Sequence, residues 1–293
     1  MPEWTADRHI EMMDANHIAT SILSLSSPGV QFLDGSRMAR LARTVNDAGA
    51  ELVAQYPGRF GLFATLPLPD VEASLVEIDY CFDTLKADGV VLMTNSKGHY
   101  PGDPRFERVF EALDRRGAVV YLHPTSPCGF EQYAMGLPTP VIEFPFDTVR
   151  AAVNLIYSGV LRRCPRIRLL LSHAGGALPM LASRIAAMSG LPIIEPRPER
   201  GAEEFREQLG SIYFDVALSA NDAAINALLE VAPIEHITFG TDFPFARGPG
   251  LEAHFAAFER IKRELGAEAA SRIERENALT LFPRLRALLA GAH

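Results

Sequence analysis

The chain has 293 residues, of which 48% are hydrophobic, so it can bury the core of one large domain. The formal net charge is −8 with no basic stripe, and no apolar run approaches the roughly 20 residues of a membrane span, so neither nucleic acid nor membrane is an expected partner. The three cysteines are widely spaced without a CxxC pair and the N-terminus lacks a signal-peptide pattern, which favours a reduced, cytoplasmic protein.

Apolar runs of strand length alternate along the chain with segments of helical spacing. The first helix is predicted over 5–16 with Thr5 as its N-cap, and Asp70 is expected to cap a later helix. Strands are expected over 18–27, 60–68, 89–95, 118–125, 167–173, 211–218 and 236–242. Continuous apolar strands separated by helices predict a parallel sheet that is covered on both faces.

Two α/β architectures fit this alternation. A doubly wound open sheet predicts a glycine-rich phosphate turn after its first strand, and the segment LSLSSPGV matches that pattern poorly. A (β/α)8 TIM barrel needs eight strands, and here a helix precedes the first of seven. We therefore expect residues 1–293 to form a single barrel domain that lacks its first strand, with strand one expected upstream of Met1.

Three of the apolar runs end on a residue that can bind a metal or move a proton. His123 follows one run, His173 follows the next, and Asp242 follows the last. Barrel active sites use groups from the carboxyl ends of several strands, so these side chains are expected to meet at one mouth. Imidazole and carboxylate groups suit Zn²⁺ or another divalent first-row metal, and a site without cysteine ligands is expected to be open and catalytic.

Each of the three residues also has an ordinary structural alternative. His123 would be a core histidine, His173 an incidental neighbour of a packing glycine pair, and Asp242 the cap of a turn. The irregular segment after His123, which is rich in aromatic residues, is too long for an ordinary βα loop. We expect it to shape the pocket, the alternative being a surface loop that packs on itself.

Four motifs carry a resemblance to a known family: YLHP, LSHAGG, FGTDFP and the closing ENALTLF. With them, the chain resembles the amidohydrolase superfamily over essentially its whole length. Within that superfamily it is similar to the branch of non-oxidative decarboxylases that includes the aminocarboxymuconate semialdehyde and dihydroxybenzoate decarboxylases. The motifs are specific for the branch and much less specific for the substrate.

The resemblance implies roles for individual residues. His123 would be the metal ligand on the fifth barrel strand, Asp242 the ligand on the eighth, and His173 the acid–base histidine on the sixth. Arg184 falls where some members present an arginine to the substrate of a neighbouring subunit, which implies a homodimer or a higher homo-oligomer; the alternative is a solvated helix residue. The implied cofactor is one divalent metal, zinc being expected and manganese the alternative.

One feature of the family is missing from this sequence. The family supplies two further ligands, as His-x-His or Glu-x-His, at the end of strand one, and no such motif precedes the first helix here. The metal site is therefore expected to be incomplete. The sequence either lacks a true N-terminal segment, which we expect, or belongs to a protein that has lost strand one and its metal.

The implied activity is metal-dependent, non-oxidative decarboxylation of a 2-hydroxybenzoate-type aromatic acid such as 6-methylsalicylate. His173 and Asp242 are the candidates for delivering the proton, and Phe63, Met93 and Phe243 are expected to hold the ring. The alternatives are a metal-dependent amide or lactone hydrolase on the same barrel, or a non-catalytic binding barrel if strand one is truly absent.

Overall fold

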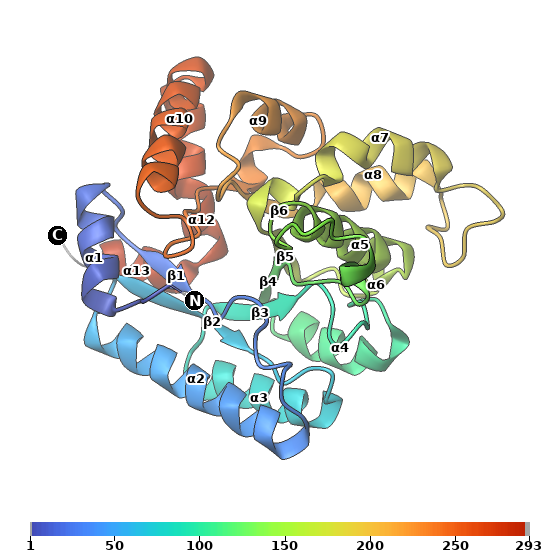
Figure 1. Ribbon diagram of the computed structural model, residues 1–293, viewed down its shortest axis with the longest axis horizontal. Helices are drawn as coiled ribbons and strands as arrows, with labels where there is room; N and C mark the ends of the chain where they lie inside the picture. The colour runs from blue at the N-terminus through green and yellow to red at the C-terminus, as the bar shows by residue number, and fades with distance from the viewer. Residues whose placement is uncertain (1, 291–293) are drawn as a thin grey trace.

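The computed structural model describes residues 2–290 and contains one sheet of seven parallel strands. The strands pair in chain order, and helices surround the curled sheet (Figure 1). This is the sequential topology of an incomplete (β/α) barrel, as the alternation predicted. The strands are β1 (Ser21–Leu23), β2 (Phe60–Thr65), β3 (Gly89–Met93), β4 (Val119–His123), β5 (Arg168–Leu171), β6 (Tyr213–Asp215) and β7 (Ile237–Thr238).

Every strand is shorter than its apolar run. The run 211–218 was expected to be one strand, but β6 ends at Asp215. The reason is local: the main-chain N–H of Ala217 donates to the Asp215 carboxylate and therefore does not extend the ladder. The first strand, expected over 18–27, keeps only three residues, because the chain turns at Ser26 and Gly29.

Helices cover the outside of the sheet, and the predicted caps are confirmed. Thr5 accepts the N–H of Arg8 at 3.2 Å, and Asp70 accepts that of Ala73 at 3.0 Å. The helices are α1 (Ala6–Ala15), α2 (Gly35–Gln55), α3 (Val71–Asp83), α4 (Glu107–Arg115), α5 (Glu143–Tyr157), α6 (Val160–Arg163), α7 (Leu178–Met188), α8 (Ala202–Gly210), α9 (Asp222–Leu229), α10 (Pro249–Leu265), α11 (Ala267–Ser271), α12 (Asn277–Leu281) and α13 (Pro283–Ala290).

The interior of the barrel has its own apolar cluster. Phe63, Met93 and Val119 project into it from β2, β3 and β4, while Phe282 and Leu285 come from the C-terminal helical region. The Phe63 ring lies 5.7 Å from the Phe282 ring and stacks on Tyr121 with 5.1 Å between the ring centroids. These contacts fill the end of the barrel at which the strands begin, so its open end lies at the carboxyl ends of the strands.

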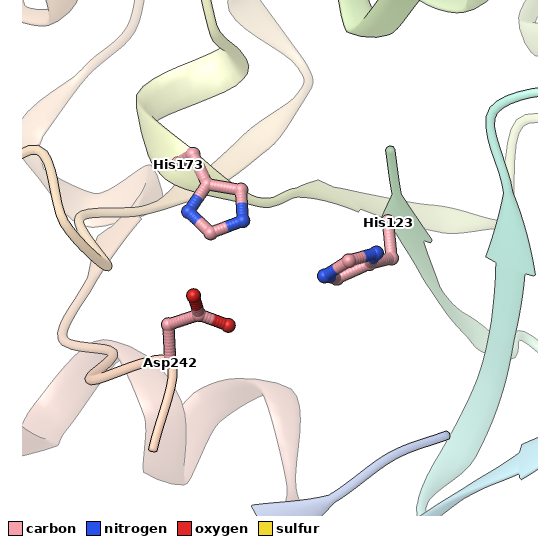
Figure 2. A group of neighbouring side chains, drawn as sticks. All are labelled: His123, His173 and Asp242. Carbon is pink, nitrogen blue, oxygen red and sulfur yellow. The ribbon is translucent and has the colours of Figure 1, made fainter. Parts of the chain in front are cut away.

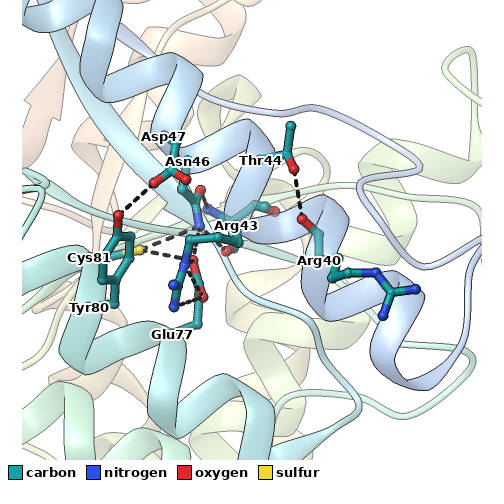
Figure 3. Close-up of polar contacts among 9 residues, drawn as sticks. Arg40, Arg43, Thr44, Asn46, Asp47, Glu77, Tyr80 and Cys81 are labelled. Atoms are coloured by element: carbon teal, nitrogen blue, oxygen red, sulfur yellow. Dashed lines mark hydrogen bonds and ion pairs between the residues drawn. The ribbon is translucent and has the colours of Figure 1, made fainter.

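A buried polar network joins α2, α3 and β2 (Figure 3). The Asn46 side chain donates to the Thr65 carbonyl at 2.9 Å and accepts the Thr65 N–H at 2.8 Å, so it replaces a strand partner for the last residue of β2. Asn46 also donates to Glu77, whose carboxylate is paired with Arg43 at 2.9 Å. The network therefore holds the end of β2 to the helices outside it.

The sheet has two ends, β1 and β7, which are not paired with each other among the described residues. Helix α1 contacts both of these edge strands or the residues next to them, and it does so with the buried side chain of His9. The His9 ring contacts Phe243, after β7, at 4.9 Å between centroids, and its Nε2 lies 3.2 Å from the Ser21 hydroxyl in β1.

In the part of the chain described, no helix is long and apolar enough to cross a membrane.

Candidate metal and acid–base site

His123, His173 and Asp242 meet at the open end of the barrel, as the sequence predicted. Their ligand atoms all lie within 4.8 Å of one another, and Figure 2 shows the three side chains pointing toward one point. His123 ends β4, His173 follows β5, and Asp242 follows β7. Because parallel strands present their carboxyl ends at the same edge, residues up to 119 positions apart in the sequence meet there.

The hydrogen bonds of the two imidazoles define their tautomers. Nδ1 of His123 lies 2.8 Å from the carbonyl of Pro124, and Nδ1 of His173 lies 3.1 Å from the carbonyl of Ala217. A carbonyl oxygen only accepts, so each Nδ1 carries the proton and donates it. Each Nε2 is therefore left with a lone pair that can bind a metal or take up a proton.

Burial sets the charge of the site. Burial, assisted by neighbouring His173, lowers the pKa of His123 to about 3, so its ring is neutral at physiological pH. Burial also raises the pKa of the Asp242 carboxyl to about 6; the nearby His173 opposes this shift and Asp215 adds to it. A carboxyl group with this pKa can hold or release a proton near neutral pH.

Two of the three residues have a left-handed backbone conformation, which residues other than glycine rarely adopt. The φ angle is 55° at His173 and 59° at Asp242. Strained backbone of this kind persists where the surrounding structure enforces it, often at functional sites. After His173, a Cβ built at Gly176 would lie 2.3 Å from the carbonyl oxygen of Pro145. Gly176 is thus needed for close packing against the start of α5, whereas its neighbour Gly175 packs against the ring of Phe214.

The three side chains fit one divalent metal ion. They offer two neutral imidazole nitrogens and one carboxylate oxygen, which is a donor set that Zn²⁺ and Mn²⁺ accept. They belong to three different strand ends, so the position between them is open to the barrel mouth. This arrangement fits a catalytic site better than a closed structural one.

The residues predicted to bind substrate lie at different depths. Met93 is the register partner of His123 and lies in the same layer. Phe63 stacks on Tyr121, which precedes His123 by two residues and therefore lies one layer deeper. Phe243 follows Asp242 and packs on His9, whereas Arg184 is exposed on α7. Contact of these four residues with a substrate stays a prediction.

The long segment after His123 contributes unevenly to the site. The ring of Phe144, at the start of α5, lies 6.3 Å from the His123 ring, so this aromatic residue does line the site. Tyr133 and Phe146 are instead 49% and 43% exposed, which places much of their surface in solvent.

Sequence reasoning missed two buried carboxylates that support the site. Asp215 accepts the main-chain N–H of His173 at 3.0 Å. Asp147, on α5, accepts from Thr94 and Asn95, and Thr94 in turn accepts the N–H of Thr125 just after His123. Asp215 follows an apolar run, as Asp242 does, but Val216 and Ala217 prolong that run and hide the strand end.

A parallel α/β barrel with histidine and carboxylate groups at its strand ends defines a class of barrel enzymes that act through those groups. The chain belongs to the amidohydrolase family, whose sequence model matches residues 3–284.

Several relatives of the chain are decarboxylases. The chain is 38% identical over 296 residues to the 6-methylsalicylic acid decarboxylase of Penicillium expansum, covering 100% of this chain and 90% of the relative. A crystal structure of 2,6-dihydroxybenzoate decarboxylase with 2,6-dihydroxybenzoate matches with a TM-score of 0.85 at 27% identity, over 95% of this chain and 88% of that one. A dihydroxybenzoic acid decarboxylase from Polaromonas sp. JS666, with bound manganese and 2-nitroresorcinol, has a TM-score of 0.85 at 26% identity, over 95% and 86%.

Proposed function

We propose that the protein is a carboxy-lyase that removes CO₂ without oxidation from a 2-hydroxybenzoate-type acid such as 6-methylsalicylate. The convergence of His123, His173 and Asp242 carries this proposal. The 38% identity to a 6-methylsalicylic acid decarboxylase supports the choice of substrate. No redox cofactor is required, because the reaction exchanges a carboxylate for a proton on one ring carbon.

We also propose that His123 and Asp242 hold one divalent metal, with zinc as the expected ion and manganese as the alternative. When bound, such an ion supplies positive charge that orients a carboxylate and its ortho hydroxyl group. The manganese-bound relative supports a divalent ion in this class. Metal content of the purified protein, measured by mass spectrometry after loading with each ion, tests the assignment.

The chain's own residues supply the proton chemistry. A proton added to the carboxyl-bearing ring carbon breaks the aromaticity, and loss of CO₂ restores it. Asp242 can deliver this proton, since burial raises its pKa to about 6. His173 can deliver it from Nε2 after that nitrogen has taken up a proton, because Nδ1 is the nitrogen that donates to the carbonyl of Ala217. Met93 and Phe144 provide apolar surface beside His123 for the ring.

The deciding experiment follows both products from 6-methylsalicylate. The metal-loaded protein should release CO₂ and 3-methylphenol in equal amounts. Asp242→Asn should lower kcat by roughly 10²–10⁴-fold, the range for loss of a general acid–base group. Asp222→Asn, the same change on the exposed start of α9, is the matched control and should keep full activity. Turnover of an amide or lactone without CO₂ would instead assign a hydrolase.

We further propose a cytoplasmic homodimer or higher homo-oligomer. The free thiols of Cys81, Cys128 and Cys164 support a reducing compartment.

Arg184 is exposed on α7, where it can reach a neighbouring subunit. If it contacts the neighbour's substrate, Arg184→Ala should raise KM by more than tenfold while the exposed Arg206→Ala leaves KM unchanged, as steady-state kinetics will show.

A further inference from the structure

Asp215 is a buried carboxylate at the end of β6 that binds three groups from other parts of the mouth. Its Oδ1 accepts the main-chain N–H of His173 at 3.0 Å and that of Ala217 at 2.9 Å. Its Oδ2 accepts the Tyr121 hydroxyl at 2.8 Å. The residue is 5% exposed, so these bonds replace the water that a carboxylate would otherwise require.

The bonds to Oδ1 complete a closed ring around His173. One oxygen draws the N–H groups of His173 and Ala217 together, and the Ala217 carbonyl then accepts the Nδ1–H of His173 at 3.1 Å. The backbone of His173 is held in its left-handed conformation, with φ of 55°. The same ring leaves Nε2 unprotonated and pointing to the position shared with His123 and Asp242.

The neighbouring strand end leaves room for this carboxylate. A Cβ built at Gly240, just after β7, would lie 3.2 Å from Cγ of Asp215 and 3.3 Å from Cβ of Ala217. A side chain at position 240 would therefore crowd both members of the ring. The space for Asp215 is provided by the same loop that carries Asp242.

We propose that Asp215 is the positioning residue of His173: it sets the backbone, the tautomer and the direction of Nε2 of the acid–base histidine. The assignment of a catalytic role to His173 rests on the proposed function, whereas the tautomer does not. Asp215 acts through His173 and is not itself expected to exchange a proton with substrate.

Steady-state kinetics of decarboxylation provide the first test. Asp215→Ala should lower kcat by about 10–100-fold, as loss of a residue that orients a histidine does, with KM within about threefold. Asp215→Asn should recover most of kcat, because its amide oxygen still accepts both N–H groups and its amide nitrogen can donate to Tyr121. Asp215→Ser, whose hydroxyl can accept one N–H, is the fallback if the alanine variant does not fold.

Asp88 provides a matched control at the opposite end of the barrel. Its buried carboxylate also accepts a main-chain N–H, that of Leu62 at 2.9 Å, and pairs with Arg284 at 2.7 Å. Asp88→Ala should lower the melting temperature while leaving kcat within about twofold. If Asp215→Ala likewise lowers only the melting temperature, the positioning role is wrong.

Nitrogen NMR provides a test that needs no turnover. In metal-free protein labelled with ¹⁵N-histidine, the His173 signals, assigned from their loss in His173→Gln, should show a protonated Nδ1 and a bare Nε2. Asp215→Ala should move them toward a mixture of tautomers, and Asp215→Asn should restore them. Unchanged His173 signals in Asp215→Ala would overturn the proposal even if decarboxylation is confirmed. A change in these signals supports it even if the wild-type protein releases no CO₂.

Discussion

His9 shows how burial decides the chemistry of a single side chain. Its Nδ1 accepts the indole N–H of Trp4 at 3.0 Å, so its Nε2 carries the proton and donates to Ser21. Burial lowers the pKa of His9 to about 4, and the folded protein therefore keeps this ring neutral. The same physical cause keeps His123 neutral at the mouth, as its proposed role as a metal ligand requires.

The His9 pKa predicts a pH dependence of stability. As the pH falls from 6.5 toward 4, the unfolded chain binds a proton at His9 that the folded chain does not, so the free energy of unfolding decreases. His9→Gln removes this titration while keeping a donor and an acceptor. Between pH 7.5 and pH 5, urea unfolding should show a loss in the wild type that exceeds the loss in the variant by about 2 kcal/mol. Equal losses would contradict it.

A second prediction at this scale concerns metal binding by His123. Because Nε2 of this neutral ring points to the site, His123→Asn should reduce zinc content to well below one ion per chain. His17→Asn is the matched control, since His17 is exposed at the end of α1 and asparagine tolerates its φ of 57°. Mass spectrometry after zinc loading and dialysis measures both; similar zinc content in the two variants would remove His123 from the ligand set.

At the scale of elements, close contacts between segments hold the site in place. The loop after β5 packs closely on the backbone of Pro145 at Gly176. The end of β2 is held by the Asn46 side chain from α2 in addition to its neighbouring strand. Each arrangement depends on a single residue, Gly176 in the first and Asn46 in the second.

The contact at Gly176 predicts a large loss of stability on substitution. In Gly176→Ala, the new Cβ would meet backbone atoms of Pro145 at 2.3–2.9 Å, and φ is 62°. Thermal and urea unfolding should show a loss of about 3 kcal/mol. Gly190→Ala is the control, because no described atom lies within 4 Å of its Cβ position, and it should change stability by less than about 0.5 kcal/mol. Comparable effects of the two changes would refute the packing explanation.

The network in Figure 3 gives the other prediction for an element. Asn46→Ala leaves the N–H and carbonyl of Thr65 without their side-chain partner, and should lower the free energy of unfolding by about 2–4 kcal/mol. Thr44→Ala, on the exposed face of the same helix, removes only a bond to the Arg40 carbonyl and should be nearly neutral. If Asn46→Ala left the free energy of unfolding unchanged, water would have to replace the lost hydrogen bonds.

At the scale of the whole molecule, the barrel brings together strand ends that the chain separates by tens of residues, and one of the segments between them carries several exposed apolar side chains. Met135 and Val141, in the segment between β4 and α5, are 79% and 58% exposed. Exposed apolar side chains along one segment are typical of a contact surface.

If that segment lies in the proposed homo-oligomer interface, charge there should dissociate it. The double variant Met135→Lys with Val141→Lys should have a lower mass in light scattering than the wild type. Val76→Lys, which adds a charge at a position on α3 whose exposure lies between those of Met135 and Val141, should not change the mass. An unchanged mass for the double variant would place the interface elsewhere.

The three strand-end residues and the barrel class could be predicted from the sequence because both depend on local patterns. An apolar run followed by His123, His173 or Asp242 is visible in neighbouring residues, and parallel strands necessarily bring their carboxyl ends to one edge. The strand boundaries were less accurate, because hydrogen bonds to side chains such as Asp215 end the ladder before the apolar run ends.

The tertiary structure alone decided how these residues can act. The tautomer of His173 depends on Ala217, 44 positions away, and the raised pKa of Asp242 depends on burial by distant elements. The support from Asp215 and the fit of Gly176 over Pro145 likewise arise between segments that only folding brings into contact. Residue types and spacing along the chain determine which groups reach the mouth, whereas contacts across the fold determine their protonation and direction.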